Sequence, residues 1–438
     1  MKNFLLALCL LLSGIGFAQN EVEFRKFKLD NGLTVILHED KTTPNVIVSV
    51  MYHVGSKNEN PDRTGFAHFF EHLLFEGSEN LERGQFDNYV EEAGGTLNAN
   101  TSFDRTFYYE ILPSNHLETA LWLESERMLH AKVEDIGIET QREVVKEERR
   151  QRMDNQPYGS LLEEILKRSY SQHPYKNTVI GSMAHLEAAT EEDYVNFYKT
   201  FYVPNNAILS IAGNIDYSDA KDAVEKYFGS IPMGTGAIPR PSIVEPELGR
   251  EIRDTIFDNI QLPAVVQAYR IPAQGTEDYY AVQMLSQLLS GGKSARMAKK
   301  LVDEDQLALQ VVNFPFSMED PGLSLTFGIA SIGTDPAILE AGMDAEVDRI
   351  HNELIGEREF QKLRNQIEAD FITGNASIAG IAESLANYEM YFGDANLINT
   401  ELERYMNVSP EDIQRVARKY FRPDNRVVLY YLPKPEQP

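Results

Sequence analysis

Cysteine is almost absent from the sequence, because Cys9 is the only one in 438 residues. A single thiol cannot form an intramolecular disulfide, so a disulfide-stapled scaffold is excluded and a hydrophobic core must stabilise the fold. Long apolar runs are also lacking after residue 20, where no stretch approaches the roughly 18 consecutive apolar residues of a membrane-spanning helix. We therefore expect no membrane span in the mature protein.

The sequence has fewer basic than acidic residues. The sequence has 41 Lys and Arg against 67 Asp and Glu, which gives a formal charge of -26. A field of this sign repels nucleic acid and anionic lipid surfaces, so we expect no nucleic-acid partner. The hydrophobic fraction of 42% is ordinary for globular proteins, and the length is sufficient for two or three domains that each have a core.

The longest apolar run stands at the start of the sequence. Lys2 precedes the apolar stretch Phe4 to Leu12, and small residues follow at Gly16 and Ala18. This order is typical of a cleavable secretory signal, which we place at residues 1–18 with cleavage after Ala18. The pattern predicts a secreted or periplasmic protein whose mature chain contains no cysteine.

A long repeat divides the sequence into two halves. Residues 190–206 and 409–425 share one pattern, in which a Thr or Ser with an acidic residue three positions later precedes a helical stretch and a turn set by Pro and Asn. Pro423 follows Pro204 by 219 residues, about half of the chain. The repeat predicts two homologous domains.

The expected fold class is α+β, with layered helices against mainly antiparallel sheets. Alternating apolar residues indicate strands within 24–37 and 45–53. The segment 233–246 is rich in Pro and Gly and is expected to link an N-terminal domain, 21–232, to a C-terminal domain, 247–438. Helical patterns of the first half lie at 65–75, 82–93, 116–131 and 136–153.

One helical segment carries a pattern typical of zinc chemistry. His68 and His72 stand four residues apart, so on a helix they share a face with Glu71 beside them. Two imidazoles on adjacent turns can hold Zn²⁺, and a neighbouring carboxylate can accept a proton from water. The spacing is the inverse of the commoner zinc-protease motif. The alternative is that these polar residues only line a core helix.

A catalytic zinc needs a third protein ligand and an open position. The segment 141–150 offers several carboxylates on a second helix. Taken alone, a charged stretch of this kind is usually a solvated helix face.

Taken together, these features resemble the pitrilysin and insulinase family of zinc peptidases, which includes the mitochondrial processing peptidase. The resemblance rests on the helix motif, on the 76 residues from His72 to Glu148, and on the duplicated halves. Supporting motifs stand at Gly94–Thr101, Phe107–Tyr109, Arg142–Glu148 and His173–Tyr175. The resemblance implies two homologous domains of the pitrilysin-type metallohydrolase fold, of which the second lacks the metal site.

The resemblance also implies the roles of individual residues. His68, His72 and Glu148 correspond to the ligands of one Zn²⁺ per chain, and Glu71 corresponds to the catalytic general base. Glu147 lies about 100° further round the helix and is a poorer ligand candidate.

In the family, a peptide substrate adds as an extra strand to an edge strand beside the zinc. The matching residues here lie within 97–101, so the resemblance implies substrate binding by Asn98, Ala99 and Thr101. Backbone pairing of this kind holds an extended peptide regardless of its sequence. The alternative is that these residues only build the strand and its turn. We interpret five other histidines as surface or structural residues: His53, His116, His130, His185 and His351.

The sequence departs from the family pattern at two places. Gln141 stands where a Glu usually supports a ligand from the second shell, so one charge is lost there. Val302 and Leu309 stand where the family has an Arg and a Tyr that reach the substrate and the developing oxyanion. Neither side chain can donate a hydrogen bond. In the second half, Val282, Leu285 and Ser286 take the places of the metal-site residues.

These features predict a secreted zinc metalloendopeptidase subunit that cleaves extended peptides and takes its Arg and Tyr from a homologous partner subunit. Two alternatives remain. One is a non-catalytic subunit that binds peptides or assembles with others through the same fold. The other is a homodimeric peptidase in which Lys299 or Lys300 replaces the missing oxyanion donor.

Overall fold

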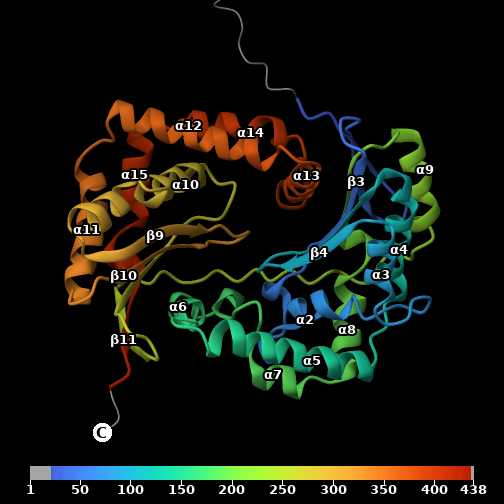
Figure 1. The fold of residues 1–438 in the computed structure, drawn as a ribbon, viewed down its shortest axis with the longest axis horizontal. Coiled ribbons are helices and arrows are strands. Elements are labelled where there is room, and N and C mark those ends of the chain that lie inside the picture. Colours follow the sequence, from blue (N-terminus) through green and yellow to red (C-terminus); the bar gives the residue numbers. More distant parts are fainter. Residues whose placement is uncertain (1–20, 436–438) are drawn as a thin grey trace, which may run out of the picture.

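The computed structural model describes residues 21–435. The predicted signal peptide, with Cys9 and the cleavage position after Ala18, lies outside these residues. Two halves lie side by side, and each half consists of a sheet with helices packed against it (Figure 1). None of the helices formed by residues 21–435 combines the length and the apolar character that a bilayer span requires.

The sheet of the first half has six strands in the order β1-β2-β6-β3-β5-β4. Neighbouring strands are antiparallel, except that β2 and β6 run parallel. The strands are β1 (Arg25–Lys28), β2 (Thr34–Glu39), β3 (Asn45–Tyr52), β4 (Thr96–Thr101), β5 (Thr106–Pro113) and β6 (Ala207–Gly213).

The sheet of the second half has five strands in the order β7-β11-β8-β10-β9, and only β7 and β11 run parallel. This order repeats the first sheet from β2 onward, so the predicted architecture of homologous α+β halves with mainly antiparallel sheets is confirmed. The strands are β7 (Ile252–Asp258), β8 (Ala264–Arg270), β9 (Ala308–Phe316), β10 (Leu323–Ala330) and β11 (Arg426–Pro433).

The helices follow the expected segments closely. The predicted helix 136–153 is in fact α5 followed by a π-helical turn, η3 (Arg150–Asp154). The first half contains α2 (Phe66–Leu73), α3 (Gln85–Glu92), α4 (Leu117–His130), α5 (Asp135–Arg149), α6 (Leu161–Ser169), α7 (Met183–Ala188), α8 (Glu191–Phe201) and α9 (Tyr217–Phe228). The second half contains α10 (Glu277–Ser290), α11 (Pro336–Asn352), α12 (Glu357–Gly374), α13 (Ile378–Phe392), α14 (Leu397–Met406) and α15 (Pro410–Tyr420).

The repeat found in the sequence corresponds to the segments α8–β6 and α15–β11. Thr190 and Asp193 form a reciprocal capping box at the start of α8, and Ser409 and Asp412 form the same box at the start of α15. Each helix is followed by a turn beginning at Pro and then by a buried strand. The same local signals therefore produce the same structure twice.

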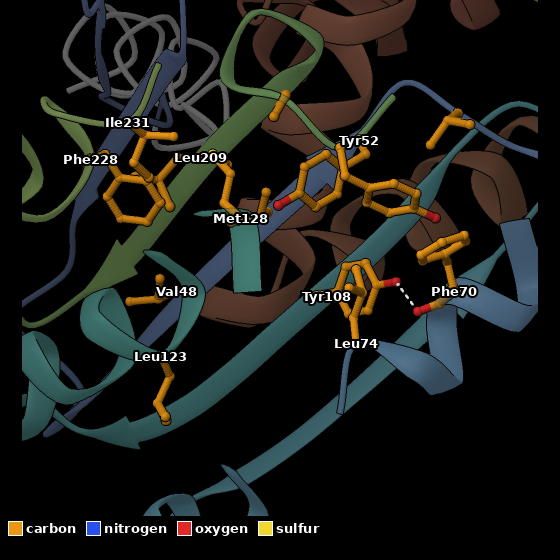
Figure 2. Packing of buried hydrophobic residues seen from close by; sticks show 14 of the residues in the cluster. Val48, Tyr52, Phe70, Leu74, Tyr108, Leu123, Met128, Leu209, Phe228 and Ile231 are labelled. Carbon is orange, nitrogen blue, oxygen red and sulfur yellow. Dashed lines mark hydrogen bonds between the residues drawn. The ribbon is translucent and has the colours of Figure 1, made fainter. Parts of the chain in front are cut away.

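Both faces of the central strands are buried. In β3, Val48 and Val50 point into the core that the first sheet forms with its own helices, part of which is seen in Figure 2. Ile47 and Met51 point the other way and belong to clusters that include residues of α13 from the second half. Burial on both faces explains why these strands are almost continuously apolar.

The two halves exchange helices. Helix α13 of the second half contacts β3 and β6 of the first sheet (Figure 1). Reciprocally, α6 of the first half contacts β8 and β11, and Ile165 and Leu166 pack with Val266 and Leu429. One face of each sheet is thus covered by a helix from the other half.

Among the described residues, 229–251 contain neither helix nor strand, and the predicted linker 233–246 falls within this segment.

Candidate metal centre

Helix α2 begins at a tightly fixed position. Gly65 precedes it with a φ of +94°, and a Cβ there would lie 2.7 Å from the carbonyl oxygen of Ile180. The Glu59 carboxylate accepts hydrogen bonds from the backbone N–H groups of Gly65 and Ala67, at 2.8 and 2.9 Å. These contacts satisfy donors that a helix N-terminus leaves unpaired.

The two faces of α2 have different surroundings. Phe69, Phe70 and Leu73 are completely buried in the core of the first half. The Tyr108 hydroxyl on β5 donates a 2.9 Å hydrogen bond to the carbonyl of Phe70 (Figure 2). Because apolar residues hold one face against the sheet, His68 and its polar neighbours project from the other.

Helix α5 packs along α2 and brings Glu148 to the two histidines. Its Oε2 atom lies 3.4 Å from His68 Nε2 and 3.3 Å from His72 Nε2. The imidazole rings of His68 and His72 are 4.9 Å apart between centroids and 74° between planes. One ligand atom from each residue lies within 4.8 Å of the other two. The structure therefore brings together the three residues predicted to be ligands.

This donor set fits a zinc ion. Glu148 Oε2 is buried and has no hydrogen-bond partner among the described residues, although both Nε2 atoms face it. Burial lowers the pKa of His68 to about 4, so its imidazole is neutral near pH 7 and keeps a lone pair for a metal. Burial favours the neutral form of Glu148, but the nearby His72 and His68 outweigh this and lower its pKa. Two imidazoles and one carboxylate match the ligand set of a catalytic zinc site with an open fourth position.

Glu71 is held apart from the three converging atoms. Thr101 on β4 donates a 2.6 Å hydrogen bond from its hydroxyl to Glu71 Oε2. Burial raises the pKa of Glu71 above its ordinary value, which brings a carboxylate closer to the range suited to a general base. Thr101 was predicted to contact substrate, so its contact with Glu71 adds a role that the sequence analysis missed.

Arg152 is a second residue that the sequence analysis missed. It lies on the π-helical turn η3, and its guanidinium is 2.8 Å from Glu148 Oε1. This contact holds one carboxylate oxygen and leaves Oε2 facing the histidines. The sequence does contain a signal for this contact: Arg152 follows Glu148 by four residues, and side chains with this spacing lie next to each other on a helix. The Arg152 side chain is 75% exposed, so it borders solvent at the site.

Gln141 does not support a ligand directly. Its amide donates a hydrogen bond to Glu76, which also pairs with Arg83 at 2.6 Å. No hydrogen bond among residues 21–435 joins Gln141 to the three converging residues. Glu147 is turned away from them and pairs with Arg150 at 3.2 Å.

Strand β4 stands at the edge of the first sheet, next to α2. Asn98 and Ala99 lie in its middle, and the Asn98 side chain accepts a 2.8 Å hydrogen bond from the Ala99 N–H.

Most of the histidines predicted to be surface or structural have polar contacts away from the three converging residues. His53, His130, His185 and His351 lie near Glu319, Glu79, Thr64 and Asp348, respectively.

The corresponding places in the second half hold no metal ligands. Val282, Leu285 and Ser286 lie on α10 and are buried in the core there. Val302 lies on η6 (Ala298–Glu304) and packs against the same core. Leu309 on β9 is 57% exposed. Neither of these last two residues can donate a hydrogen bond from its side chain.

Comparison with known proteins decides the family. Residues 34–183 match the family described as insulinase, peptidase family M16, and residues 188–367 match the domain described as peptidase M16 inactive domain. A zinc protease, PqqE, from Helicobacter pylori is 31% identical over 408 residues, which are 92% of each chain. The chain belongs to the insulinase family of peptidases. The predicted resemblance is therefore confirmed, and zinc and peptide hydrolysis are the chemistry named for its relatives.

Solved structures share the fold of this insulinase-family chain. A protease from Helicobacter pylori superposes with a TM-score of 0.90 at 30% identity, covering 94% of this chain and all of the other. The periplasmic protease PqqL from Escherichia coli has a TM-score of 0.77 at 18% identity, and the match covers 94% of this chain but 48% of PqqL. The fold thus occurs both in chains of this length and within longer ones.

Proposed function

We propose that this protein is a zinc metalloendopeptidase that hydrolyses extended peptides, with His68, His72 and Glu148 as the ligands of one Zn²⁺ per chain. The convergence of one atom from each of these residues within 4.8 Å is the observation that carries the proposal. Membership of a family of peptidases supports it.

Each residue of the proposed site has a different role in peptide hydrolysis. A bound Zn²⁺ would polarise the scissile carbonyl and lower the pKa of a water molecule. Glu71 accepts the proton of the attacking water and passes it to the leaving amine. The Thr101 hydroxyl holds the Glu71 carboxylate in one orientation. The open edge of β4 at Asn98 and Ala99 would pair with the peptide backbone, which would favour extended substrates.

The chain is proposed to act with a homologous partner subunit. Val302 and Leu309 provide no donor for the oxyanion, and the loss of one such donor typically lowers the rate by 10² to 10³. The lysines considered as substitutes lie near carboxylates of their own segment: Lys299 is 3.8 Å from Glu304, and Lys300 is 2.9 Å from Asp305. We therefore favour a partner that supplies Arg and Tyr over a homodimer, and a stimulation of the rate on mixing would support it.

The compartment is part of the proposal. The pattern at residues 1–18 supports export, and PqqL, which shares the fold, is described as periplasmic. A periplasmic or secreted location also suits a mature chain without cysteine, since no thiol is exposed to oxidation there. The acidic balance argues against nucleic acid as a partner.

The proposal is tested by hydrolysis of an unstructured peptide, measured for the zinc-loaded chain with and without its candidate partner. Glu71→Gln should retain zinc and lose hydrolysis, because the amide cannot accept the proton. Glu147→Gln is the matched control and should behave as wild type, since Glu147 points away from the site. Release of zinc by Glu71→Gln would show that its role has been assigned wrongly.

A non-catalytic peptide-binding or assembly subunit is the alternative from another class. It would bind extended peptides yet leave them uncut with zinc and every candidate partner present. The complete set of His68, Glu71, His72 and Glu148 supports the enzyme instead, because a scaffold has no need of a free base beside a metal site.

A further inference from the structure

A partly buried polar cluster lies where the two halves meet. We call it the interdomain cluster. The second half contributes the turn between β9 and β10, which carries Glu319 and Asp320. The first half contributes Lys57, Asp104, His173 and Tyr175, each less than 5% exposed. The cluster includes the His173–Tyr175 motif, to which the proposed catalytic site assigns no role.

Asp104 is the centre of the interdomain cluster. Its Oδ1 atom accepts a 2.6 Å hydrogen bond from the Tyr175 hydroxyl and lies 3.1 Å from the ammonium group of Lys57. Its Oδ2 atom accepts a 3.0 Å hydrogen bond from the backbone N–H of Glu319 in the other half. One carboxylate therefore ties the first half to the backbone of the second.

Asp320 belongs to the same cluster but makes different contacts. Its carboxylate lies 3.2 Å from Lys57 Nζ and 3.3 Å from His173 Nε2. Both partners are side chains outside the segment that joins β4 to β5. Asp320 thus contributes a similar charge to the interface without touching that segment directly.

Asp104 itself stands on the hairpin 102–105 that connects β4 to β5. Ser102 N donates to Arg105 O at 2.8 Å, which closes the turn. The backbone N–H of Lys57 donates to the carbonyl of Phe103 at 2.9 Å. A Cβ at Gly55 would lie 2.4 Å from the backbone of Phe103, so the packing there is close. The hairpin is therefore held as a rigid unit.

The hairpin leads directly to the proposed general base. Thr101 is the last residue of β4 and immediately precedes the hairpin. Its hydroxyl is the group that donates to Glu71 Oε2 at 2.6 Å. A shift of the hairpin would move this hydroxyl, and small errors in the placement of reacting groups cost large factors in rate.

We propose that Asp104 is a positioning residue through which docking of the second half, by way of the hairpin 102–105 and Thr101, orients Glu71. The inference rests on the proposed role of Glu71. According to this proposal, the second half, which has no metal ligands, helps to orient Glu71. The His173–Tyr175 motif supports Asp104 in this role.

The test compares Asp104→Asn with Asp320→Asn in the zinc-loaded chain, assayed together with the candidate partner subunit. Asn keeps the size of Asp104 but cannot accept from both Tyr175 and the Glu319 N–H while facing Lys57. We expect kcat to fall by about 10-fold or more with KM changed less than about 2-fold, because binding on β4 is retained. Asp320→Asn should change kcat less than about 2-fold. Zinc content should stay at the wild-type value in both variants.

A double-mutant cycle separates positioning from loss of stability. If Asp104 acts through Thr101, then Asp104→Asn should cost less than about 2-fold in kcat when Thr101→Val is already present. A full additional 10-fold loss in that background, or an equal loss in Asp320→Asn, would overturn the proposal.

Hydrogen exchange provides a readout that does not depend on catalysis. Backbone amides of 101–105 should exchange faster in Asp104→Asn than in Asp320→Asn, with the amides of α2 and of 97–100 unchanged. Unchanged exchange in the hairpin would contradict the inference even if the chain proves to be inactive. Absence of hydrolysis by wild type, together with the expected exchange pattern, would instead count against the proposed function alone.

Discussion

Carboxylates of one residue type take different roles at this site because their surroundings differ. Glu148 is partly buried against two imidazoles, Glu71 is held by a threonine hydroxyl, and Glu147 is exposed and paired with Arg150. Neighbouring position in the sequence is therefore a poor guide to role, since 100° of rotation on a helix separates the proposed ligand Glu148 from the solvated side chain of Glu147.

The two adjacent carboxylates provide a residue-scale prediction. Glu148→Gln should lower zinc affinity by a factor of about 100 or more, because it removes the negative charge and replaces one carboxylate oxygen by an NH₂ group that cannot bind the metal. Glu147→Gln should leave the affinity unchanged. Competition with a chelating dye measures both values, and equal losses in the two variants would argue that Glu148 is not a ligand.

A fully buried charge network underlies the site at the same scale. Arg127 on α4 is in contact range of Glu110 and Glu124, at 3.4 Å from each. Its guanidinium lies 4.3 to 4.4 Å from the ring centres of Phe75, Phe86 and Tyr108. Burial, and then the neighbouring Glu124, raise the pKa of Glu110 well above its ordinary value, which favours the protonated form of Glu110.

This network predicts that replacing Arg127 destabilises the protein much more than replacing Glu110. Arg127→Met should lower the free energy of unfolding by about 3 to 5 kcal/mol, because it leaves a buried carboxylate without its partner. Glu110→Gln should cost less than about 1 kcal/mol, since an amide resembles the protonated acid in shape and charge. Urea titrations of the three proteins measure the difference. A large loss in Glu110→Gln would show that Glu110 is ionised in the folded state.

At the scale of elements, the local parts of the fold were predictable and the pairing between elements was not. The spacing of His68, Glu71 and His72 predicts α2 because it follows the helical repeat, and the capping signals predict α8 and α15. The apolar stripe of α13 does not say which sheet it covers. The exchange of α6 and α13 between halves therefore emerges only from the packing.

In the site, too, the local features were predictable from the sequence and the contacts between elements were not. Glu148 was accessible to sequence analysis through a family spacing, whereas its contact with Arg152 depends on α5 continuing as a π-helical turn. The contact between Thr101 and Glu71 depends on β4 lying against α2. The contact between Thr101 and Glu71 joins residues 30 positions apart, and no periodic pattern encodes it.

At the scale of the whole molecule, the halves are joined by exchanged helices and by partly buried charges. Glu319 of the second half lies 3.1 Å from His53 of the first and also contacts Lys57. Burial opposes ionisation of Glu319, but the contacts with His53 and Lys57 outweigh it and lower its pKa to about 2. The interface between halves therefore contains a carboxylate that favours the charged state.

This lowered pKa predicts how stability depends on pH. A carboxyl group with a depressed folded pKa stabilises the protein above its unfolded value of about 4.3, and the contribution is lost as pH falls towards about 2. Glu319→Gln should therefore be about 1 to 2 kcal/mol less stable than wild type at pH 7. The difference should shrink as the pH falls. Denaturant titrations at pH 7, 4 and 3 measure it, and a constant gap would show that Glu319 is not the group responsible.

The central claim is that His68, His72 and Glu148 hold one zinc ion beside a free Glu71. The most direct measurement is an anomalous difference map, recorded on either side of the zinc absorption edge, from crystals of the zinc-loaded chain. The account predicts one strong peak per chain, about 2.0 to 2.2 Å from His68 Nε2, His72 Nε2 and a Glu148 oxygen. A peak elsewhere, or none at this site with zinc present, would contradict it.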